Sequence, residues 1–159
     1  MIRVLMLCMG NICRSPMAEA VFRDMVEKAG LSDKITVDSA GTSSYHVGEP
    51  AHHGTLQVLE ENNIFYDGTS RQIRAEDFVK FDYILAMDRG NLHSIERYRS
   101  HFNGRAQVAL FLSYAHQAKL LDYDEVDDPY YTGRFRDTYE TISIGARAFL
   151  DYLRKRHSL

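Results

Sequence analysis

The sequence predicts an α/β fold built on a parallel, doubly wound sheet. Two observations lead to this prediction. Short apolar runs alternate along the chain with segments of helical periodicity, and the first run leads directly into a glycine-containing loop and a helix start. Ligands of such sheets bind at the carboxyl ends of strands, where the strand order reverses. We therefore expect the functional site at the loop that follows the first strand.

The first half of the chain is expected to hold two strands and two helices. Residues 2–7 predict a buried strand around the apolar run VLML. A helix over 16–29 follows and stops at Gly30, and its apolar residues recur at helical spacing: Ala18, Val21, Phe22, Met25 and Ala29. Residues 35–37 predict a second strand, and residues 51–63 a second helix.

The second half is expected to complete the sheet. Residues 83–87 (YILAM) and 108–111 (VALF) are apolar enough to form buried strands. The last helix is the best defined element, because its apolar side chains recur at spacings of four and three: Phe135, Tyr139, Ile142, Ala146, Phe149 and Leu153. The chain has no repeat, low-complexity tract or linker, so residues 1–159 are expected to form one domain.

The segment CMGNICRSP, residues 8–16, predicts an anion-binding loop. Ser15 and Pro16 are a strong helix start, since Ser suits the N-cap and Pro suits the first helical position. The unpaired N–H groups of that helix would point back into the loop, and Gly10 would relax the steric limits on the turn. Successive amides can then converge on one point as a nest that binds a dianion.

Two side chains give this loop a chemistry. Cys8 would lie at the focus of positive potential, which stabilises a thiolate nucleophile, and the Ser15 hydroxyl could donate to it. Arg14 can hold two oxygens of a phosphoryl group as charge redistributes in the transition state. A lone cysteine after a buried strand is more often a small hydrophobic residue. The combination of thiol, glycine, arginine and helix start favours a nucleophile that handles phosphate.

The chain resembles the low-molecular-weight protein tyrosine phosphatases. Residues 8–22 (CMGNICRSPMAEAVF) are similar to the signature loop and first helix of that family. Its later motifs are matched in the same order by residues 38–42 (DSAGT), 81–88 (FDYILAMD) and 128–131 (DPYY). The resemblance implies a four-stranded parallel sheet in the order 2-1-3-4 with helices on both faces, a flavodoxin-like, Rossmann-like phosphatase fold. It also implies hydrolysis of phosphotyrosine through a phosphocysteine intermediate.

A thiolate that displaces a phenoxide needs a proton donor for the leaving oxygen. An acidic run, usually a solvated loop, offers the candidates Asp122, Asp124, Glu125, Asp127 and Asp128. Asp128 differs from the others because Pro129 restricts its backbone to extended conformations. The resemblance implies that the Asp before this proline is the general acid. We therefore expect Asp128 to protonate the leaving group and then to act as the base on water.

Aromatic residues beside this acid predict a substrate slot. Tyr130 and Tyr131, together with Met9, Ile12 and Tyr45, are expected to form walls that fit a phenyl ring. Phosphoserine is too short to bring its phosphorus to the floor of such a slot. The expected substrate is a phosphotyrosine-containing protein or an aryl phosphate, and inorganic phosphate is the expected product inhibitor.

The resemblance implies roles for the rest of the site. Asn11 and Ser39 would hold the loop in an unusual conformation, with Asp88 as a further supporting residue. The chain departs from the better-known mammalian members at Tyr45, where those have a Trp, and at Gly68 or nearby, where they have a His in the supporting network. These departures bear on substrate preference and loop support. The residues expected to bind phosphate are Met9, Gly10, Asn11, Ile12, Cys13, Arg14 and Ser15.

Composition argues against several other functions. The chain is 45% hydrophobic and 26% charged, and its net charge of −3 argues against a general nucleic-acid or anionic-membrane binder. No apolar stretch is long enough for a signal peptide or a membrane span. Both cysteines lie in the loop, which favours a reducing compartment over a disulfide framework, so we expect a cytoplasmic enzyme.

No metal or cofactor is expected. His52 and His53 are adjacent, but no carboxylate or cysteine lies at ligand spacing beside them, so they are interpreted as surface helix residues. The other histidines are scattered and carry no signal: His46, His93, His101, His116 and His157.

Three alternative functions remain. Arsenate reductases share the fold and the loop but need further cysteines, and this chain has none beyond Cys13. Protein-arginine phosphatases of the same fold carry Thr at the position of Ile12, where the hydroxyl orients the attacking water, and the apolar Ile12 favours an aryl phosphate instead. A non-catalytic phosphate-binding module would keep Arg14 but have no use for both Cys8 and Asp128.

The two cysteines also predict redox control. Peroxide should oxidise Cys8 to a sulfenic acid faster than an ordinary thiol. Cys13, five positions along the chain, could then capture Cys8 as a disulfide. The simpler interpretation is that Cys13 fills space beneath the loop.

Overall fold

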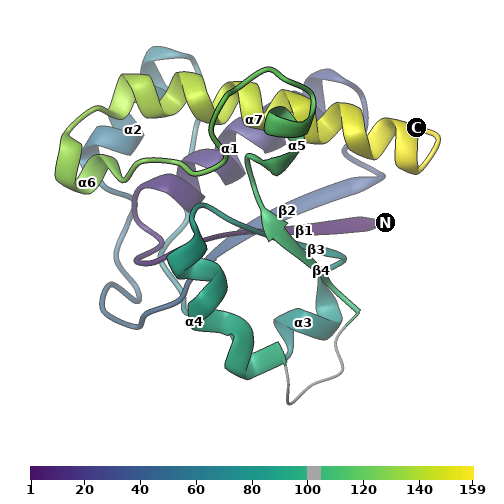
Figure 1. The fold of residues 1–159 in the computed structure, drawn as a ribbon. Helices are drawn as coiled ribbons and strands as arrows, with labels where there is room; N and C mark the ends of the chain where they lie inside the picture. Colours follow the sequence, from purple (N-terminus) through teal and green to yellow (C-terminus); the bar gives the residue numbers. More distant parts are fainter. Residues whose placement is uncertain (100–104) are drawn as a thin grey trace.

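The computed structural model describes residues 1–99 and 105–159, which form a parallel sheet with helices on both faces (Figure 1). The strands β1 (Ile2–Cys8), β2 (Ile35–Gly41), β3 (Tyr83–Ala86) and β4 (Gln107–Leu110) lie in the order β2-β1-β3-β4. Each neighbouring pair is parallel, so the expected fold class and strand order are confirmed. His101 lies outside the described residues.

Helices cover the segments where the sequence predicts them. α1 (Arg14–Lys28) follows β1, α2 (His53–Glu61) follows β2, and α7 (Phe135–Arg156) closes the chain. Gly30 lies just past the end of α1 with a φ of 71°, the left-handed conformation that favours glycine after a helix. The structure adds helices that the sequence analysis did not predict: α3 (Asp77–Lys80), α4 (Arg89–Arg99), α5 (Ser113–Gln117) and α6 (Pro129–Thr132).

β2 is longer than the predicted strand over 35–37. Its second half continues the pairing with β1, so that Asp38 lies opposite Leu5 and Ser39 opposite Met6. Polar residues are uncommon in a buried parallel sheet, which is why the sequence pattern ends at residue 37. The extension carries Ser39 to the carboxyl end of the sheet, next to the loop that follows β1.

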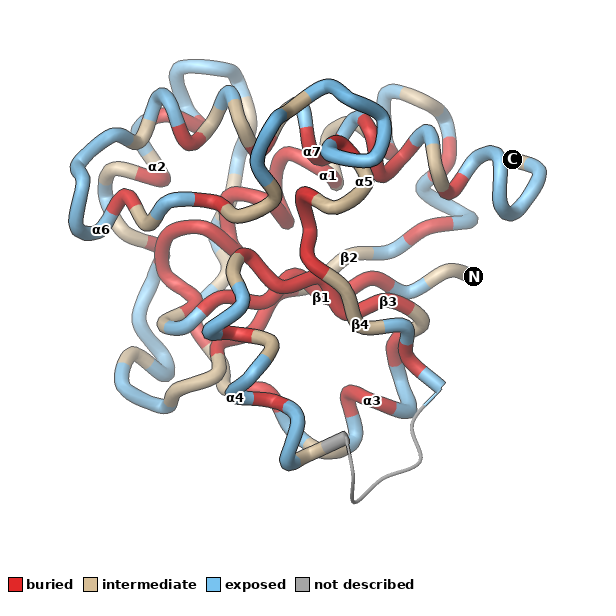
Figure 2. The backbone as a smooth tube through the Cα atoms, viewed as in Figure 1, coloured by how far each residue is buried: buried red, intermediate tan, exposed pale blue. Residues whose placement is uncertain are grey.

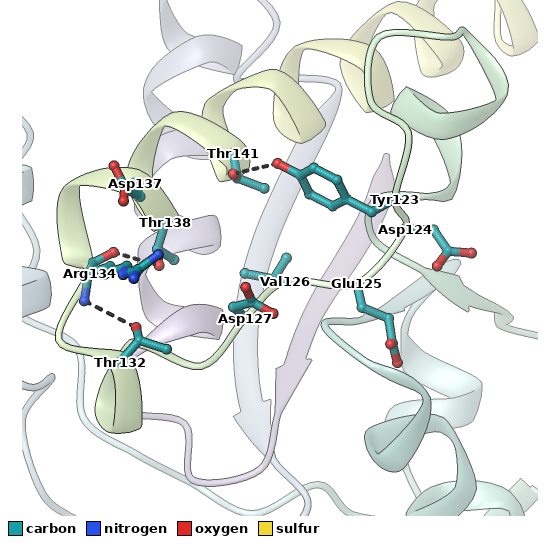
Figure 3. Close-up of a pocket in the computed structure, with 10 residues that line it drawn as sticks. All are labelled: Tyr123, Asp124, Glu125, Val126, Asp127, Thr132, Arg134, Asp137, Thr138 and Thr141. Atoms are coloured by element: carbon teal, nitrogen blue, oxygen red, sulfur yellow. Dashed lines mark hydrogen bonds between the residues drawn. The ribbon is translucent and has the colours of Figure 1, made fainter.

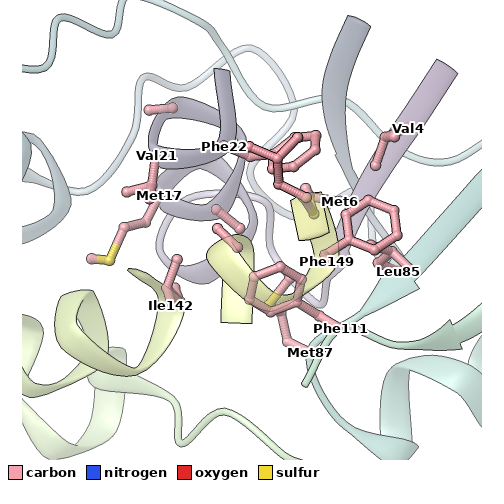
Figure 4. Close-up of a cluster of buried hydrophobic side chains, with 14 of the residues drawn as sticks. Val4, Met6, Met17, Val21, Phe22, Leu85, Met87, Phe111, Ile142 and Phe149 are labelled. Carbon is pink, nitrogen blue, oxygen red and sulfur yellow. The ribbon is translucent and has the colours of Figure 1, made fainter. Parts of the chain in front are cut away.

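Side chains of β1 alternate between two hydrophobic layers, as the period of a strand requires. Val4 and Met6 belong to a cluster with residues of α1 and α7, which Figure 4 shows around Phe22 and Phe149. Leu5 and Leu7 belong to a second cluster on the opposite face of the sheet, whose other members include Phe78, Phe81 and Ile95 from the α3–α4 region. Figure 2 shows the strands buried between these layers.

The strand order fixes the position of the loop after β1. The chain passes from β1 to β2 on one side and places β3 on the other, so the order reverses beside β1. The loop therefore lies at the reversal point, where sheets of this kind bind ligands. Among the described residues, no helix is long and apolar enough to cross a bilayer.

Candidate active site

The loop between β1 and α1 folds around the sulfur of Cys8. The backbone N–H of Asn11 points at this sulfur, with 3.3 Å between N and Sγ. This turn depends on a left-handed residue, and that residue is Asn11, whose φ is 56°. Gly10 was expected to supply the conformational freedom of the turn, but Asn11 adopts the left-handed conformation instead. Asn tolerates that conformation better than most residues. Gly10 instead makes room for His46, whose Cδ2 lies 3.1 Å from where a Cβ would stand.

The expected N-cap role of Ser15 is wrong, because α1 begins two residues earlier than expected, at Arg14, with Cys13 in the N-cap position. The Ser15 side chain is fully buried and its Oγ lies 3.0 Å from the Cys8 sulfur. Backbone N–H groups in the first turn of α1 lack carbonyl partners within the helix and face the same loop. The start of α1 thus adds to the Asn11 N–H a hydroxyl contact and a positive potential beside the thiol.

Asn11 also fixes the loop through its side chain. Its Nδ2 donates to Ser15 Oγ at 2.8 Å and to Ser39 Oγ at 3.0 Å, and its Oδ1 accepts from the backbone N of Arg71 at 3.0 Å. Because the Ser15 oxygen accepts from Asn11, its hydroxyl hydrogen can be donated to the Cys8 sulfur, which lies at 3.0 Å, nearer than the Ala40 carbonyl at 3.5 Å. Ser39 therefore acts on the thiol through Asn11 and Ser15.

A second layer of hydrogen bonds holds Ser39. Ser39 Oγ donates to Glu19 Oε1 at 2.6 Å, and Tyr66 Oη donates to the same oxygen at 3.0 Å. Arg23 pairs with the other oxygen of this buried carboxylate. Burial, and next the charge of Glu19, raise the pKa of Tyr66. The chain from Tyr66 to Cys8 is thus made of groups that are paired at every step.

Gly68 is not part of this network. A Cβ at Gly68 would lie 2.4 Å from the Tyr66 hydroxyl, so the tyrosine occupies the space that a side chain there would need. Tyr66, two residues earlier in the chain, reaches Glu19 instead. The departure at Gly68 noted in the sequence is therefore accompanied by a replacement donor, which the sequence pattern alone did not reveal.

The guanidinium of Arg14 is held in place by hydrogen bonds to Asp88 and Val126. Its Nη1 donates to Asp88 Oδ2 and to the carbonyl of Val126, both at 2.8 Å, and its Nη2 lies 3.5 Å from Asp128 Oδ2. Burial opposes the charge of this guanidinium, but Cys8, Asp88 and Asp128 together raise its pKa above the usual value. Arg14 therefore keeps its charge while buried, and Asp88 fixes its orientation.

Asp128 lies above the loop at the N-cap of α6. Its backbone is extended, with φ −86° and ψ 110°, as expected for a residue before proline. One carboxylate oxygen, Oδ1, accepts from the backbone N of Tyr130 at 3.1 Å, and the other faces Arg14. The segment before it is anchored at Val126, whose N–H donates to the carbonyl of Met87 at the end of β3.

These side chains line one cavity of about 250 Å³. Cys8 and Ile12 are buried, whereas Tyr45 is 84% exposed and Tyr131 73% exposed at the mouth. Tyr130 and Tyr131 meet edge to face, with ring centroids 5.2 Å apart. The cavity thus has a buried polar floor and exposed aromatic walls. Its lining residues are Cys8, Met9, Gly10, Ile12, Cys13, Arg14, Ser43, Tyr45, His46, Asp128, Tyr130 and Tyr131.

Cys13 lies in the same cavity as Cys8, and both thiols are free. Burial, followed by the charges of Asp128 and Cys8, raises the pKa of Cys13 to about 12. The Cys13 carbonyl accepts from Thr55 Oγ1 of α2 at 3.1 Å. Cys13 is therefore a neutral thiol that lines the same cavity as Cys8.

A larger cavity of about 440 Å³ lies beside the acidic segment, between residues 123–127 and the start of α7 (Figure 3). Asp127 lines this cavity and not the one that contains Cys8. Hydroxyls and charged groups, among them Thr138, Thr141 and Arg134, line it together with apolar side chains, and none of its lining residues is a cysteine. Both adjacent carboxylates line a groove beside Arg14, but Asp128 alone of this pair lines the cavity that contains the Cys8 sulfur.

Sequence reasoning missed several residues at the site. His46, which carried no signal, lines the cavity and bonds Glu49 through Nδ1 at 2.9 Å. His52 was interpreted as a surface helix residue, but it caps α2 and contacts Tyr130. Glu19 and Tyr66 support the loop from below. Within residues 1–99 and 105–159, no three His, Cys, Asp or Glu side chains are grouped to hold a metal ion.

Comparisons with known proteins agree with this geometry. Residues 3–159 match the family described as low molecular weight phosphotyrosine protein phosphatase. The protein of that name from Schizosaccharomyces pombe is 49% identical over 154 residues, which cover 94% of this chain and 95% of that protein. The low molecular weight protein-tyrosine-phosphatase YfkJ of Bacillus subtilis is 43% identical over 160 residues, covering 100% of both chains.

Solved structures resemble the whole fold. The crystal structure of YfkJ matches with a TM-score of 0.91 and 42% identity, covering 98% of this chain and 96% of that one. The structure of the Drosophila arginine phosphatase DARP matches with a TM-score of 0.87 and 33% identity, covering 95% and 97% of the two chains. The fold is thus shared by enzymes named for two different phosphorylated side chains.

Proposed function

The chain belongs to the low molecular weight phosphotyrosine protein phosphatase family, and we propose that it hydrolyses phosphotyrosine with Cys8 as nucleophile, Arg14 as phosphate ligand and Asp128 as general acid and base. One observation carries this assignment: these three side chains line a single cavity, with the thiol at its buried floor. The chemistry below uses only groups of this chain, the substrate and water.

In the first step, the Cys8 sulfur attacks phosphorus in line with the leaving oxygen, and the S–P bond forms as the P–O bond to the phenol breaks. The electron pair of that bond goes to the phenol oxygen, which takes a proton from Asp128. The Nη2 of Arg14 and the amides of residues 9–15 bind the equatorial oxygens, where charge accumulates. Asp88 holds the guanidinium so that little reorganisation is needed.

In the second step, water attacks the phosphocysteine. The Asp128 carboxylate, having lost its proton, takes one from the water as the new O–P bond forms. The S–P bond breaks and its electron pair returns to the sulfur, which leaves as a thiolate. Asn11 N–H and Ser15 Oγ lie 3.3 Å and 3.0 Å from that sulfur and stabilise its charge, so they help it to leave. Inorganic phosphate is released and is expected to compete with substrate.

The walls of the cavity favour an aryl phosphate. Ile12 is 8% exposed beside the thiol, and Tyr130 and Tyr131 rise from α6 above it. A phenyl ring between such walls gains apolar contact along its full length, and each ring contact adds about 0.5–1.5 kcal/mol beyond burial. A phosphoserine has no ring to fill the space between these walls. We infer that the substrate is a phosphotyrosine side chain of another protein.

Phosphoarginine is the second candidate substrate, because DARP, with 33% identity and the same fold, is named an arginine phosphatase. Protein-arginine phosphatases of this fold are expected to carry a threonine at the position of Ile12, where the threonine hydroxyl orients the attacking water. The apolar side chain of Ile12 lines the cavity here and offers water no hydrogen bond. Phosphotyrosine therefore remains the better candidate.

The proposal extends to the domain, the phosphate loop and the second cysteine. Residues 1–159 form one domain, a cytoplasmic enzyme whose two cysteines remain reduced in the absence of an oxidant. Met9, Gly10, Asn11, Ile12 and Cys13 supply the backbone that surrounds the phosphate. Cys13 captures an oxidised Cys8 as a disulfide and so protects it from irreversible oxidation.

The experiment that tests the proposed function compares three phosphopeptides of the same sequence, carrying phosphotyrosine, phosphoserine or phosphoarginine. Phosphate release by the purified protein should be fastest from the phosphotyrosine peptide. Cys8→Ser should abolish release from all three. Equal rates on phosphoserine and phosphotyrosine, or a faster rate on phosphoarginine, would contradict the assignment of the aryl slot.

A further inference from the structure

His52 connects the start of α2 to the phosphate loop. Its backbone N–H donates to the carbonyl of Ile12 at 2.7 Å. Its side chain caps α2, because Nδ1 accepts from the backbone N of Gly54 at 3.0 Å. A ring nitrogen that accepts a hydrogen bond carries no proton, so this geometry requires the neutral imidazole with its hydrogen on Nε2.

The turn that His52 caps holds a second part of the loop. Thr55, fully buried in the first turn of α2, donates from Oγ1 to the carbonyl of Cys13 at 3.1 Å. Two successive carbonyls of the loop, those of Ile12 and Cys13, are therefore bound by residues at the beginning of α2. The position of this turn sets the outer edge of the loop that surrounds the Cys8 sulfur.

The ring of His52 also supports the aromatic wall of the slot. It stacks on Phe135 at the start of α7, with centroids 4.9 Å apart and planes at 19°. It also contacts Tyr130, edge to face at 6.0 Å and 78°. Gly54 is packed against the same Phe135 ring, since a Cβ there would lie 2.6 Å from it. One imidazole thus joins α2, α6 and α7 beside the slot.

We propose that His52 is a positioning residue whose neutral ring holds Ile12 and Tyr130 in place, so that affinity for an aryl phosphate falls when His52 is protonated. The inference rests on the proposed function in that the slot is taken to bind a phosphate-bearing ring. Protonation converts Nδ1 from an acceptor into a donor that faces the Gly54 N–H, which breaks the cap and places two donors against each other.

The surroundings of His52 favour the neutral form. His53 of α2 stacks on its free face with centroids 4.3 Å apart, and Tyr130 of α6 is the other titratable ring in contact. Charged residues line the space beyond Gly54 and Phe135: Glu61 paired with Arg136, together with Arg134 and Asp137. From the loop, Cys13 is a neutral thiol. Burial, and next the charge of His53, lower the pKa of His52 below its usual range.

The direction of the pH dependence follows from this lowered pKa. The unfolded chain binds the proton more readily than the folded chain. The stability that the neutral His52 cap contributes to the start of α2 is therefore complete above an ordinary histidine pKa of about 6.5, and it is lost as pH falls below that value. The phosphonate group of the probe also changes its protonation state during such a scan. Dividing the Kd of the unchanged protein by the Kd of a variant that lacks only the His52 imidazole removes this contribution.

The test measures the Kd of benzylphosphonate, a non-hydrolysable probe, from pH 5 to 8 for the unchanged protein, His52→Asn, His52→Asp and the matched control His53→Asn. Asn and Asp both cap helices without titrating in this range. The ratio of the Kd of the unchanged protein to that of His52→Asn should rise about two- to fivefold from pH 8 to pH 5. His53→Asn should keep this pH dependence, with its midpoint moved to higher pH.

Nuclear magnetic resonance provides a readout that needs no variant. The Gly54 amide proton should shift along the titration of the His52 ring and with the same midpoint. The proposal would be overturned if the ratio of the Kd of the unchanged protein to that of His52→Asn stayed constant with pH. It would also be overturned if the chemical shift of the Gly54 amide proton did not change as His52 titrates. Its failure differs from failure of the proposed function, because benzylphosphonate binding without hydrolysis of any phosphopeptide would contradict the catalytic assignment alone.

Discussion

Replacement of Asp128 by Asn separates the two tasks of this residue. In the structure, Oδ1 accepts from the backbone N of Tyr130 and so caps α6, while Oδ2 lies 3.5 Å from Arg14 Nη2. Asn is as good an N-cap as Asp, so Asp128→Asn should keep α6 and the slot wall in place. It removes the transferable proton. Asp128→Ala removes both the proton and the cap.

The expected magnitudes follow from these contacts. A positioned general acid contributes about 10²–10⁴-fold, so both variants should lose that much kcat on phenyl phosphate, whose phenoxide needs protonation. The loss should be smaller on p-nitrophenyl phosphate, whose leaving group departs unprotonated more readily. Loss of the cap costs about 1 kcal/mol, so Asp128→Ala should melt at a lower temperature, whereas the Tm of Asp128→Asn should stay close to that of the unchanged protein.

The assay measures kcat on both esters together with Tm, and Asp127→Asn is its matched control. Asp127 is the neighbouring carboxylate, but it is exposed and does not line the cavity that contains Cys8, so its replacement should change kcat by less than about threefold, because exposed charges interact weakly. Equal losses on the two esters for Asp128→Asn would refute the leaving-group argument. A loss of kcat in Asp127→Asn as large as that in Asp128→Asn would refute the assignment of Asp128 as the general acid.

Three other predictions follow from named contacts. Tyr66→Phe removes one donor from the buried Glu19 carboxylate and should lower the free energy of unfolding by about 1–3 kcal/mol, measured by urea denaturation; no change would show that Tyr66 does not support the loop. Ile12→Thr should raise the ratio of kcat/KM on phosphoarginine to that on phosphotyrosine, and an unchanged ratio would remove Ile12 from the selectivity argument. Cys13→Ser should remain active when reduced but lose the thiol-reversible part of its inactivation by peroxide, and full recovery of this variant on reduction would count against a protective disulfide.

The sheet could be predicted because its strands are short apolar runs with little competing pattern. The run Val4–Leu7 is buried on both faces, and such strands are recognisable from composition alone. The second half of β2 was not predicted because Asp38 and Ser39 are polar. Ser39 uses its hydroxyl to contact Asn11 of the loop. α3, α5 and α6 are four or five residues long, too short for a helical period to be recognised.

The site could be predicted where its residues lie close together in the sequence or carry a backbone signal. Cys8, Arg14 and Ser15 share one loop, and Asp128 is marked by the proline after it. Glu19, Tyr66, His46 and His52 carry no such mark, since their roles depend on which distant segments the fold brings to β1. The role of Ser15 was misjudged for a related reason. A serine before a proline suits an N-cap, but here Ser15 lies inside α1 and its side chain contacts Asn11 and Cys8.

The central claim is that Cys8 carries the phosphoryl group between the two steps. The most direct test quenches the reaction with acid during turnover of an aryl phosphate and locates the modification by tandem mass spectrometry. We predict one phosphoryl group on Cys8 in the unchanged protein and none in Cys8→Ser. With p-nitrophenyl phosphate as substrate, a larger fraction of Asp128→Asn should carry the phosphoryl group, because this variant lacks the base for the second step. Turnover by Cys8→Ser, or a phosphoryl group on another residue, would contradict it.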